Sequence, residues 1–359
     1  MTFRNELHQN TSHKPFKYLK LSVITDSYLI LGMLLLHVLM LALTKSVSAL
    51  IVVFASVFAA CLVEALHAGF HKKQFFAWTV AVIHGIIIAF LLPEHYPPLT
   101  VFCVVFCVLF VNTFLLGGFA NSWINPICAA VAICWILGMK FFPAMGISFA
   151  DLQTKNPALI LIQNGTFPTS AVDPKITSFL NTKIFSAFGV SIPEGYVSLF
   201  WDSHSIIPAF RFNFLTLISS LVLFSLDVFG LLIPAFFALS YGLLVKIVTP
   251  LFCGGNLFSG DLLLAFLTSG ILFCTLFVIQ IPGTTPLTNR GKICYGVAAG
   301  FIAFFLVGAG TSSIGAVFTI LTINLISLLI QTVENNYQRN YETQVLYPKV
   351  QAIEEGIDA

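Results

Sequence analysis

Two short polar segments hold most of the side chains that could bind a ligand in an otherwise apolar chain. The first, residues 117–126 (GGFANSWINP), combines glycines, asparagines and a proline. An irregular backbone persists at membrane depth only where protein or a ligand satisfies its polar groups. The segment is therefore either a ligand-binding loop or a tight turn in which the proline begins a helix. Its candidate ligand-binding residues are Gly117, Gly118, Asn121, Asn125 and Pro126.

The second segment, residues 281–292 (IPGTTPLTNRGK), offers hydroxyl groups and a permanent cation. Thr285, Thr288 and Arg290 would suit a polar or anionic group. The alternative is a solvated turn whose basic residues serve only to orient the chain in a membrane.

Catalytic motifs and metal-binding patterns are absent from the sequence. There is no Ser-His-Asp arrangement, phosphate-binding loop or HExxH motif. Cys103 and Cys107 would share one face of a helix, but no CxxC or Cys/His pair accompanies them. We therefore predict neither a catalytic residue nor a metal site.

The composition shows what kind of elements must position these segments. Of 359 residues, 58% are hydrophobic and only 9% are charged, whereas a soluble domain has about 25% charged residues. So few charges cannot cover the surface of a soluble globule. The net charge of +2 and the lack of a basic tract argue against a nucleic-acid partner. We predict an all-α polytopic membrane protein with about ten transmembrane helices.

The apolar segments fall into two groups of five around a polar stretch of about 70 residues. The first group spans residues 28–43, 49–68, 76–92, 100–116 and 124–141. The second spans residues 212–229, 231–248, 261–281, 292–307 and 314–331. An odd-numbered half that is repeated once must be inverted, so a 5+5 inverted repeat is expected. Glycines precede both the fifth segment and the tenth, which is a weak similarity between the two halves.

Lysine and arginine residues near the short connections indicate the orientation. They favour cytoplasmic termini and an external or periplasmic central loop. The expected parts are a cytoplasmic N-terminal segment (1–25), a first five-helix half (26–141), the external loop (142–211), a second five-helix half (212–332) and a cytoplasmic tail (333–359).

The two polar segments resemble the signatures of a known family. Residues 117–143 resemble the GG-x-x-x-N-x-x-NP signature of the D subunit of the Rnf electron-transport complex and of the B subunit of the sodium-translocating NADH:quinone oxidoreductase. Residues 259–296 resemble the second signature, in which a D-P-x-T-x-P-x-T-x-x-G loop precedes a helix. Here Pro282 and Gly283 replace the usual Asp-Pro.

The resemblance implies that a flavin is bound. In this family an FMN is linked through a phosphoester to a threonine of the outer loop, within D-x-x-[ST]-G-A-T. The best match is DPKIT, which makes Thr177 the candidate acceptor after Asp173, although the Gly-Ala is missing and the spacing is about two residues shorter. Thr166, Thr169 and Thr182 are alternatives. B-type members also hold a noncovalent riboflavin, which we would place near residues 117–126 and 284–290.

The expected function is a flavin-carrying integral membrane subunit of an ion-translocating (Na⁺ or H⁺) electron-transport complex. Its partners would be other membrane and flavoprotein subunits, and its location the bacterial cytoplasmic membrane. The length favours the Rnf-like D subunit, since B-type relatives usually have a longer N-terminal extension. The alternatives are a small-solute channel or transporter on the same scaffold, and a scaffold subunit that binds no flavin.

Overall fold

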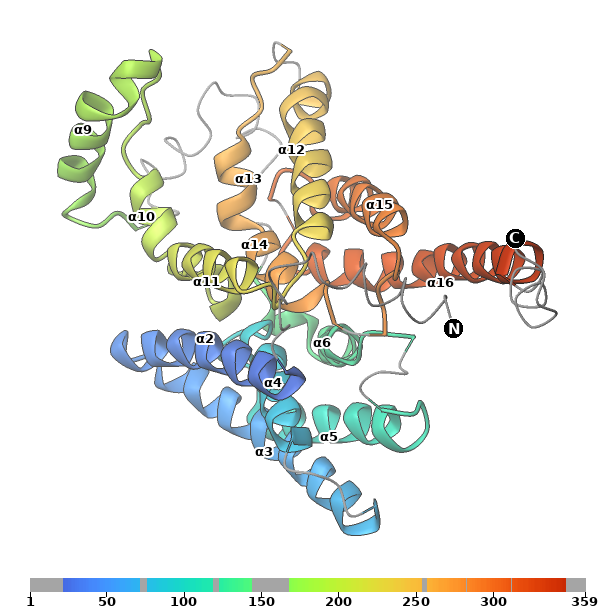
Figure 1. Cartoon of the computed structure of the whole chain (residues 1–359). Helices are drawn as coiled ribbons and strands as arrows, with labels where there is room; N and C mark the ends of the chain where they lie inside the picture. The colour runs from blue at the N-terminus through green and yellow to red at the C-terminus, as the bar shows by residue number, and fades with distance from the viewer. Residues whose placement is uncertain are drawn as a thin grey trace, which may run out of the picture.

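A computed structural model describes residues 22–71, 76–118, 123–143, 168–253, 257–281, 283–310 and 312–346. Among these residues the secondary structure is helical, without strands (Figure 1). The helices before the central loop are α2 (Val23–Leu43), α3 (Val47–His71), α4 (Phe76–Phe90), α5 (Pro98–Phe114) and α6 (Pro126–Leu137). Pro98 and Pro126 occupy the first helical position, where a missing N–H costs no hydrogen bond.

The central part contributes α9 (Asp173–Lys183) and α10 (Tyr196–Trp201), with short 3₁₀ turns beside them. The later helices are α11 (Asn213–Ser225), α12 (Leu232–Cys253), α13 (Leu262–Thr268), α14 (Ile271–Phe273), the π-helix η4 (Cys274–Val278), α15 (Asn289–Val307) and α16 (Gly315–Tyr341). Five of the described helices, α2, α3, α12, α15 and α16, are long and apolar enough to cross a membrane. The predicted class is confirmed: this is an all-α, multi-pass membrane protein.

The eighth predicted span, residues 261–281, is not one continuous helix. Gly270 has φ +68°, and a Cβ there would lie 1.9 Å from Cε1 of Phe210. The chain therefore breaks between α13 and α14 and continues as a π-helix. The prediction of a single span was wrong because a hydropathy pattern reports only apolar character. It does not show that one residue adopts a left-handed backbone conformation.

The fifth span also ends earlier than predicted, at Leu137 instead of residue 141. The Tyr96 hydroxyl donates a hydrogen bond of 2.7 Å to the Cys134 carbonyl. A Cβ on Gly138 would lie 2.6 Å from that hydroxyl. The tyrosine approaches closely at the end of α6, and the helix stops there. At 1.5 Å per residue, α6 is about 18 Å long.

The two groups of helices share features of packing. In the first, α3 lies along α5, and in the second, α12 lies along α15. α6 and α16 pack against each other between the groups. Glycines with positive φ precede both of these helices: Gly117 and Gly118 before α6, and Gly308 and Gly310 before α16. The glycines at the two places therefore share positive φ values.

The helix bundle has two ends, which we name by their central residues. At the Arg211 end, Arg211 reaches Ser46 in the connection between α2 and α3. At the Asn125 end, Asn125 contacts Val278 at the end of η4. The 21 residues of α2 separate the two ends by about 30 Å. Between them, His37 Nε2 lies 3.2 Å from Thr216 Oγ1 and links α2 to α11.

Close packing of α3 on α4 leads to a first prediction. A Cβ on Gly85 would lie 2.6 Å from the Val57 Cα, whereas one on Gly32 would meet nothing within 4 Å. We expect Gly85→Ala to destabilise the protein by roughly 1–3 kcal/mol, because α4 must move away from α3. Thermal unfolding in detergent would measure this. The matched control, Gly32→Ala, should leave the melting temperature unchanged or slightly higher, and an equal loss in both variants would contradict the prediction.

Candidate functional site

Asn125 is the polar junction between the two groups of helices. It is fully buried and caps α6, since its Oδ1 accepts hydrogen bonds from the backbone N–H groups of Ile127 and Cys128 at 3.0 and 3.3 Å. Its Nδ2 donates to the Val278 carbonyl at 2.9 Å. With the Asn324 amide oriented to satisfy its neighbours, Asn324 Oδ1 accepts from the Asn125 N–H at 3.1 Å. The side chain of Asn125 is therefore committed to protein contacts.

The rest of the first polar segment is only partly described. Gly117 and Gly118 adopt φ values of +85° and +80°, which only glycine reaches without strain. The Gly118 N–H donates to the Asn112 carbonyl at 3.0 Å and closes the end of α5. Pro126 is buried at the start of α6. Asn121 lies outside the described residues.

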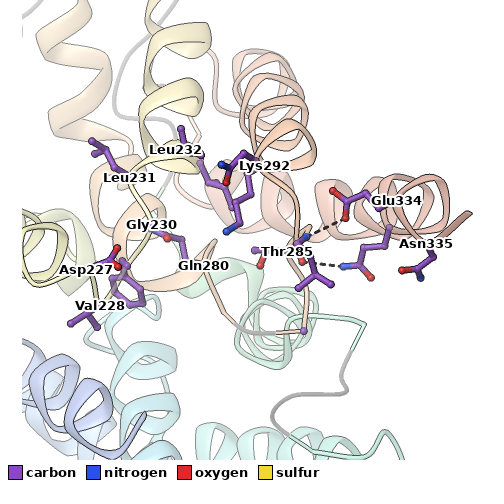
Figure 2. A pocket seen from close by; sticks show the side chains of 16 residues that line it. Asp227, Val228, Gly230, Leu231, Leu232, Gln280, Thr285, Lys292, Glu334 and Asn335 are labelled. Carbon is purple, nitrogen blue, oxygen red and sulfur yellow. Dashed lines mark hydrogen bonds between the residues drawn. The ribbon is translucent and has the colours of Figure 1, made fainter. Parts of the chain in front are cut away.

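An open cavity of about 780 Å³ lies at the Asn125 end. We call it the Thr285 cavity. Figure 2 shows its walls: residues 227–232 from the connection between α11 and α12, Gln280 after η4, Lys292 on α15, and Glu334 on α16. Its lining includes amide, hydroxyl, carboxylate and ammonium groups. The volume lies within the range of small-molecule sites, about 300–1,000 Å³.

Glu334 fixes the shape of this cavity. Its carboxylate accepts hydrogen bonds from the N–H groups of Leu287 and Thr288 at 3.1 and 3.2 Å, and from the Thr288 hydroxyl. Gln331 Nε2 donates to the Thr285 carbonyl at 3.2 Å (Figure 2). The loop before α15 is thus held by the last turns of α16. The sequence analysis did not predict Glu334 or Gln331 as site residues. Each contacts a loop residue 46 positions earlier in the chain, and a local sequence pattern does not indicate such a contact.

The predicted residues of the second polar segment play different parts. Thr285 lines the cavity. Thr288 caps α15, accepting from the Gly291 N–H at 3.0 Å. Arg290 is exposed and is not among the lining residues.

Gln280 was not predicted, yet its Nε2 is buried and has no hydrogen-bond partner among the described residues. A buried amide without a partner is costly, so it marks a place for a bound group.

Thr177 and Asp173 form a compact cluster in the central part of the chain. The carboxylate accepts from Thr177 Oγ1 at 3.0 Å, Gly195 N–H at 2.9 Å, and both the N–H and the hydroxyl of Ser198 at 2.7 and 2.6 Å. Both side chains are buried, with 2–3% exposed. Burial raises the pKa of Asp173, but the hydrogen bonds from Ser198, Gly195 and Thr177 outweigh it and hold this pKa below its ordinary value.

This arrangement does not fit a phosphoester at Thr177. The acceptor oxygen is buried and donates to a carboxylate, and a phosphate in its place would put two negative groups in contact. Of the alternatives, Thr169 and Thr182 are exposed, while Thr166 lies outside the described residues. Covalent attachment at Thr177 stays a prediction that rests on the family motif alone.

The comparison with known families agrees with both polar segments. The NQR2, RnfD, RnfE family matches residues 10–339. The chain belongs to this family. This membrane protein is therefore a subunit of an Rnf/Nqr-type oxidoreductase complex, and other subunits are its partners. No curated protein matches the chain.

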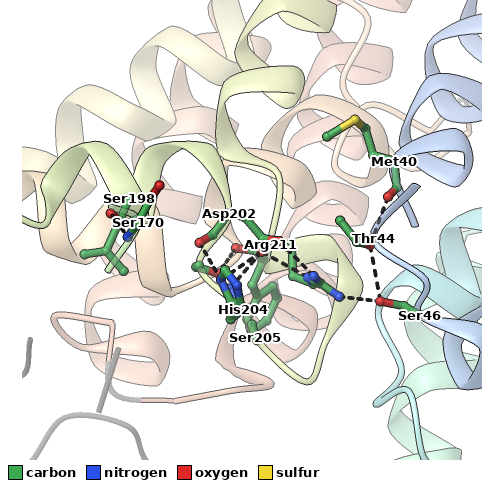
Figure 3. Close-up of polar contacts among 12 residues, drawn as sticks. Met40, Thr44, Ser46, Ser170, Ser198, Asp202, His204, Ser205 and Arg211 are labelled. Carbon is green, nitrogen blue, oxygen red and sulfur yellow. Dashed lines mark hydrogen bonds and ion pairs between the residues drawn. The ribbon is translucent and has the colours of Figure 1, made fainter. Parts of the chain in front are cut away.

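The Arg211 end of this family member is held by an ion pair that sequence reasoning did not predict (Figure 3). Arg211 donates from Nε to Asp202 Oδ1 at 3.0 Å and from Nη2 to Oδ2 at 2.8 Å. Its Nη1 donates to Ser46 Oγ at 2.7 Å. Burial raises the pKa of Asp202, but the bonds from Arg211 and His204 lower it below its ordinary value. The pair ties the central loop to the α2–α3 connection.

The Asn125 junction yields a second prediction. Asn125→Ala removes the cap of α6 and leaves the Val278 carbonyl with only the long hydrogen bond of 3.4 Å from the Ile281 N–H. We expect a loss of roughly 1–3 kcal/mol in stability, because a buried polar group loses its partner. The measurement is thermal unfolding of the detergent-solubilised protein. Asn335→Ala, at an exposed position of the Thr285 cavity, should unfold like the unchanged protein.

The Asp173 cluster yields a third prediction, on pH. Because the folded pKa is depressed, the stabilisation is complete above the unfolded pKa of about 3.9 and is lost as the pH falls through the lower folded value. Asp173→Asn should imitate acid at neutral pH. We expect trypsin to cleave at Lys175 and Lys183 at least about tenfold faster, from a loss of about 1.4 kcal/mol. Glu194→Gln is the matched control, because Glu194 lies nearby but is exposed, and this variant should be cleaved at the unchanged rate. Unchanged cleavage of the Asp173 variant would refute the role of the cluster.

Proposed function

We propose that this subunit carries electrons through the membrane domain of its complex with a flavin held noncovalently in the Thr285 cavity. The observation that supports the proposal is a cavity bordered by the second family signature, in which the buried Gln280 Nε2 has no partner among the residues that the structure describes. The complex would translocate Na⁺ or H⁺, and the Rnf-like D subunit remains our expectation for its type.

The lining of the Thr285 cavity suits the polar edge of an isoalloxazine ring, which needs both donors and acceptors. Gln280 supplies an amide whose Nε2 has no hydrogen-bond partner within the described part of the chain. Asn289 and Asn335 add amides, and Lys292 adds a cation that would stabilise negative charge on a reduced ring. Phe229 adds an apolar contact. These residues would bind and orient the ring, while the flavin supplies one- or two-electron transfer.

The proposed orientation places the Asn125 end, with the Thr285 cavity, on the cytoplasmic side of the bacterial inner membrane. Lys292 and Arg290 lie at this end, as the positive-inside rule favours. The Asp173 cluster and the Asp202–Arg211 pair would then lie outside. Both termini would be cytoplasmic.

Flavin content tests the proposal. The complex purified from its native host should release flavin on denaturation, and Lys292→Ala should lower the amount retained by this subunit at least about tenfold, a loss of about 1.4 kcal/mol in binding. Arg290→Ala, outside the lining, is the matched control. Complete retention in the Lys292 variant would contradict binding in this cavity.

A denaturing gel separates the covalent possibility from the noncovalent one. We expect no fluorescent band for this chain, because the Thr177 hydroxyl is buried against Asp173. A fluorescent band that disappears in Thr177→Val would instead establish covalent FMN. Solute flux into liposomes that contain this chain alone would favour a channel, since a redox subunit should be inert without its partners.

A further inference from the structure

A second cavity lies at the Arg211 end, beside the connection between α2 and α3. We call it the Lys45 cavity. It is open and has a volume of about 430 Å³. Figure 3 shows part of its wall, where Arg211, His204 and Ser205 of the central loop lie near Ser46. Both α2 and α3 are long and apolar enough to cross a membrane, so the connection between them, with the cavity beside it, lies at a membrane surface.

One side of the Lys45 cavity offers hydrogen-bond donors to an anion. The Lys45 ammonium has no hydrogen bond or ion pair within the described part of the chain. The charge of Arg211 is neutralised by Asp202, but its bonds to Asp202 and Ser46 use only three of the five N–H groups of a guanidinium. α3 begins at Val47, which lines the cavity, and the positive end of the helix dipole also favours a negative group.

Glu94 brings a negative charge to the same cavity, from the connection between α4 and α5. Its backbone N–H donates to the Ile206 carbonyl at 2.9 Å, which fixes it beside the central loop. Its carboxylate lies 3.3 Å from Nε2 of His95, a side chain that is 68% exposed. Among the ion pairs of the described residues, none joins Glu94 to Lys45. A ligand that carries both a negative and a positive group would satisfy both side chains.

An exposed apolar face of α3 begins at this cavity. Val47 lines the cavity, and Ile51, Phe54 and Phe58 follow it on the same face of the helix, four, seven and eleven residues later. At least half of each of these four side chains is exposed. The rings of Phe54 and Phe58 stack with their centroids 6.1 Å apart. Such a face suits an acyl chain that continues from a group bound in the cavity.

We propose that the Lys45 cavity binds the headgroup of a phospholipid that carries a primary ammonium, as phosphatidylethanolamine does. The phosphate would accept hydrogen bonds from Lys45, from the remaining N–H groups of Arg211 and from the first turn of α3. The ammonium would donate to the Glu94 carboxylate, and one acyl chain would lie along the apolar face of α3. The lipid would join the α2–α3 and α4–α5 connections to the central loop. The site does not depend on a bound flavin.

Native mass spectrometry of the delipidated full chain in detergent tests this site. Phosphatidylethanolamine, phosphatidylglycerol and phosphatidylcholine with identical acyl chains are added in turn, and we expect one phosphatidylethanolamine to bind most tightly. Lys45→Gln should weaken its binding about threefold or more, a loss of about 0.7 kcal/mol, while Lys45→Arg should keep it. Lys140→Gln is the matched control, because Lys140 is exposed but does not line the cavity.

Glu94→Gln tests the recognition of the ammonium. It should reduce the preference for phosphatidylethanolamine over phosphatidylglycerol about threefold or more, because the carboxylate no longer attracts the ammonium or repels the anionic lipid. An unchanged preference in this variant would refute the role of Glu94. Equal binding of the three lipids by the unchanged protein, or unchanged binding by Lys45→Gln, would overturn the site.

Glycerophosphoethanolamine, the same headgroup without acyl chains, distinguishes a lipid from a soluble ligand. We expect it not to displace the lipid at equal concentration, because it cannot use the apolar face of α3. Displacement at equal concentration would overturn the assignment to a lipid. All samples can be free of flavin, so this result and the flavin measurement fail independently.

Discussion

The hydrogen bonds of Asn125 are the constraint on which the rest of the described bundle depends. Inside a membrane, helix ends and broken helices survive only if their polar backbone groups find partners within the protein. One amide satisfies the start of α6 with its oxygen and the end of η4 with its nitrogen. The chain can therefore end η4 inside the protein with the Val278 carbonyl hydrogen-bonded, and the two groups of helices meet at this point.

The Thr285 cavity lies beside the end of η4. Because η4 ends at Val278, Gln280 leaves the helical path and lines this cavity. Glu334 and Gln331 then hold the loop that follows, so the wall with Thr285 keeps its position. The position of Gln280 and the fixed wall at Thr285 together shape the Thr285 cavity.

The central loop shows which contacts hold the DPKIT motif in place. In DPKIT, the aspartate and threonine are one helical turn apart on α9, so the hydroxyl reaches the carboxylate. Three donors from residues 195–198 complete the coordination of that carboxylate. The cluster binds α9 to α10, and the Asp202–Arg211 pair ties the same loop to Ser46. Both devices are structural, and both leave their polar atoms engaged.

The sequence by itself determined the membrane class, the places of nine of the ten apolar helices and the family, because apolar length and loop motifs are local properties. The helix start at Pro126 was readable for the same reason. Only the tertiary structure decided that Asn125 joins α6 to the end of η4, that Thr177 is buried, and that Gly270 breaks a span. It also decided that Gln280 and Glu334 line one cavity. Those outcomes depend on which distant side chains meet, and a hydropathy pattern carries no information about such contacts.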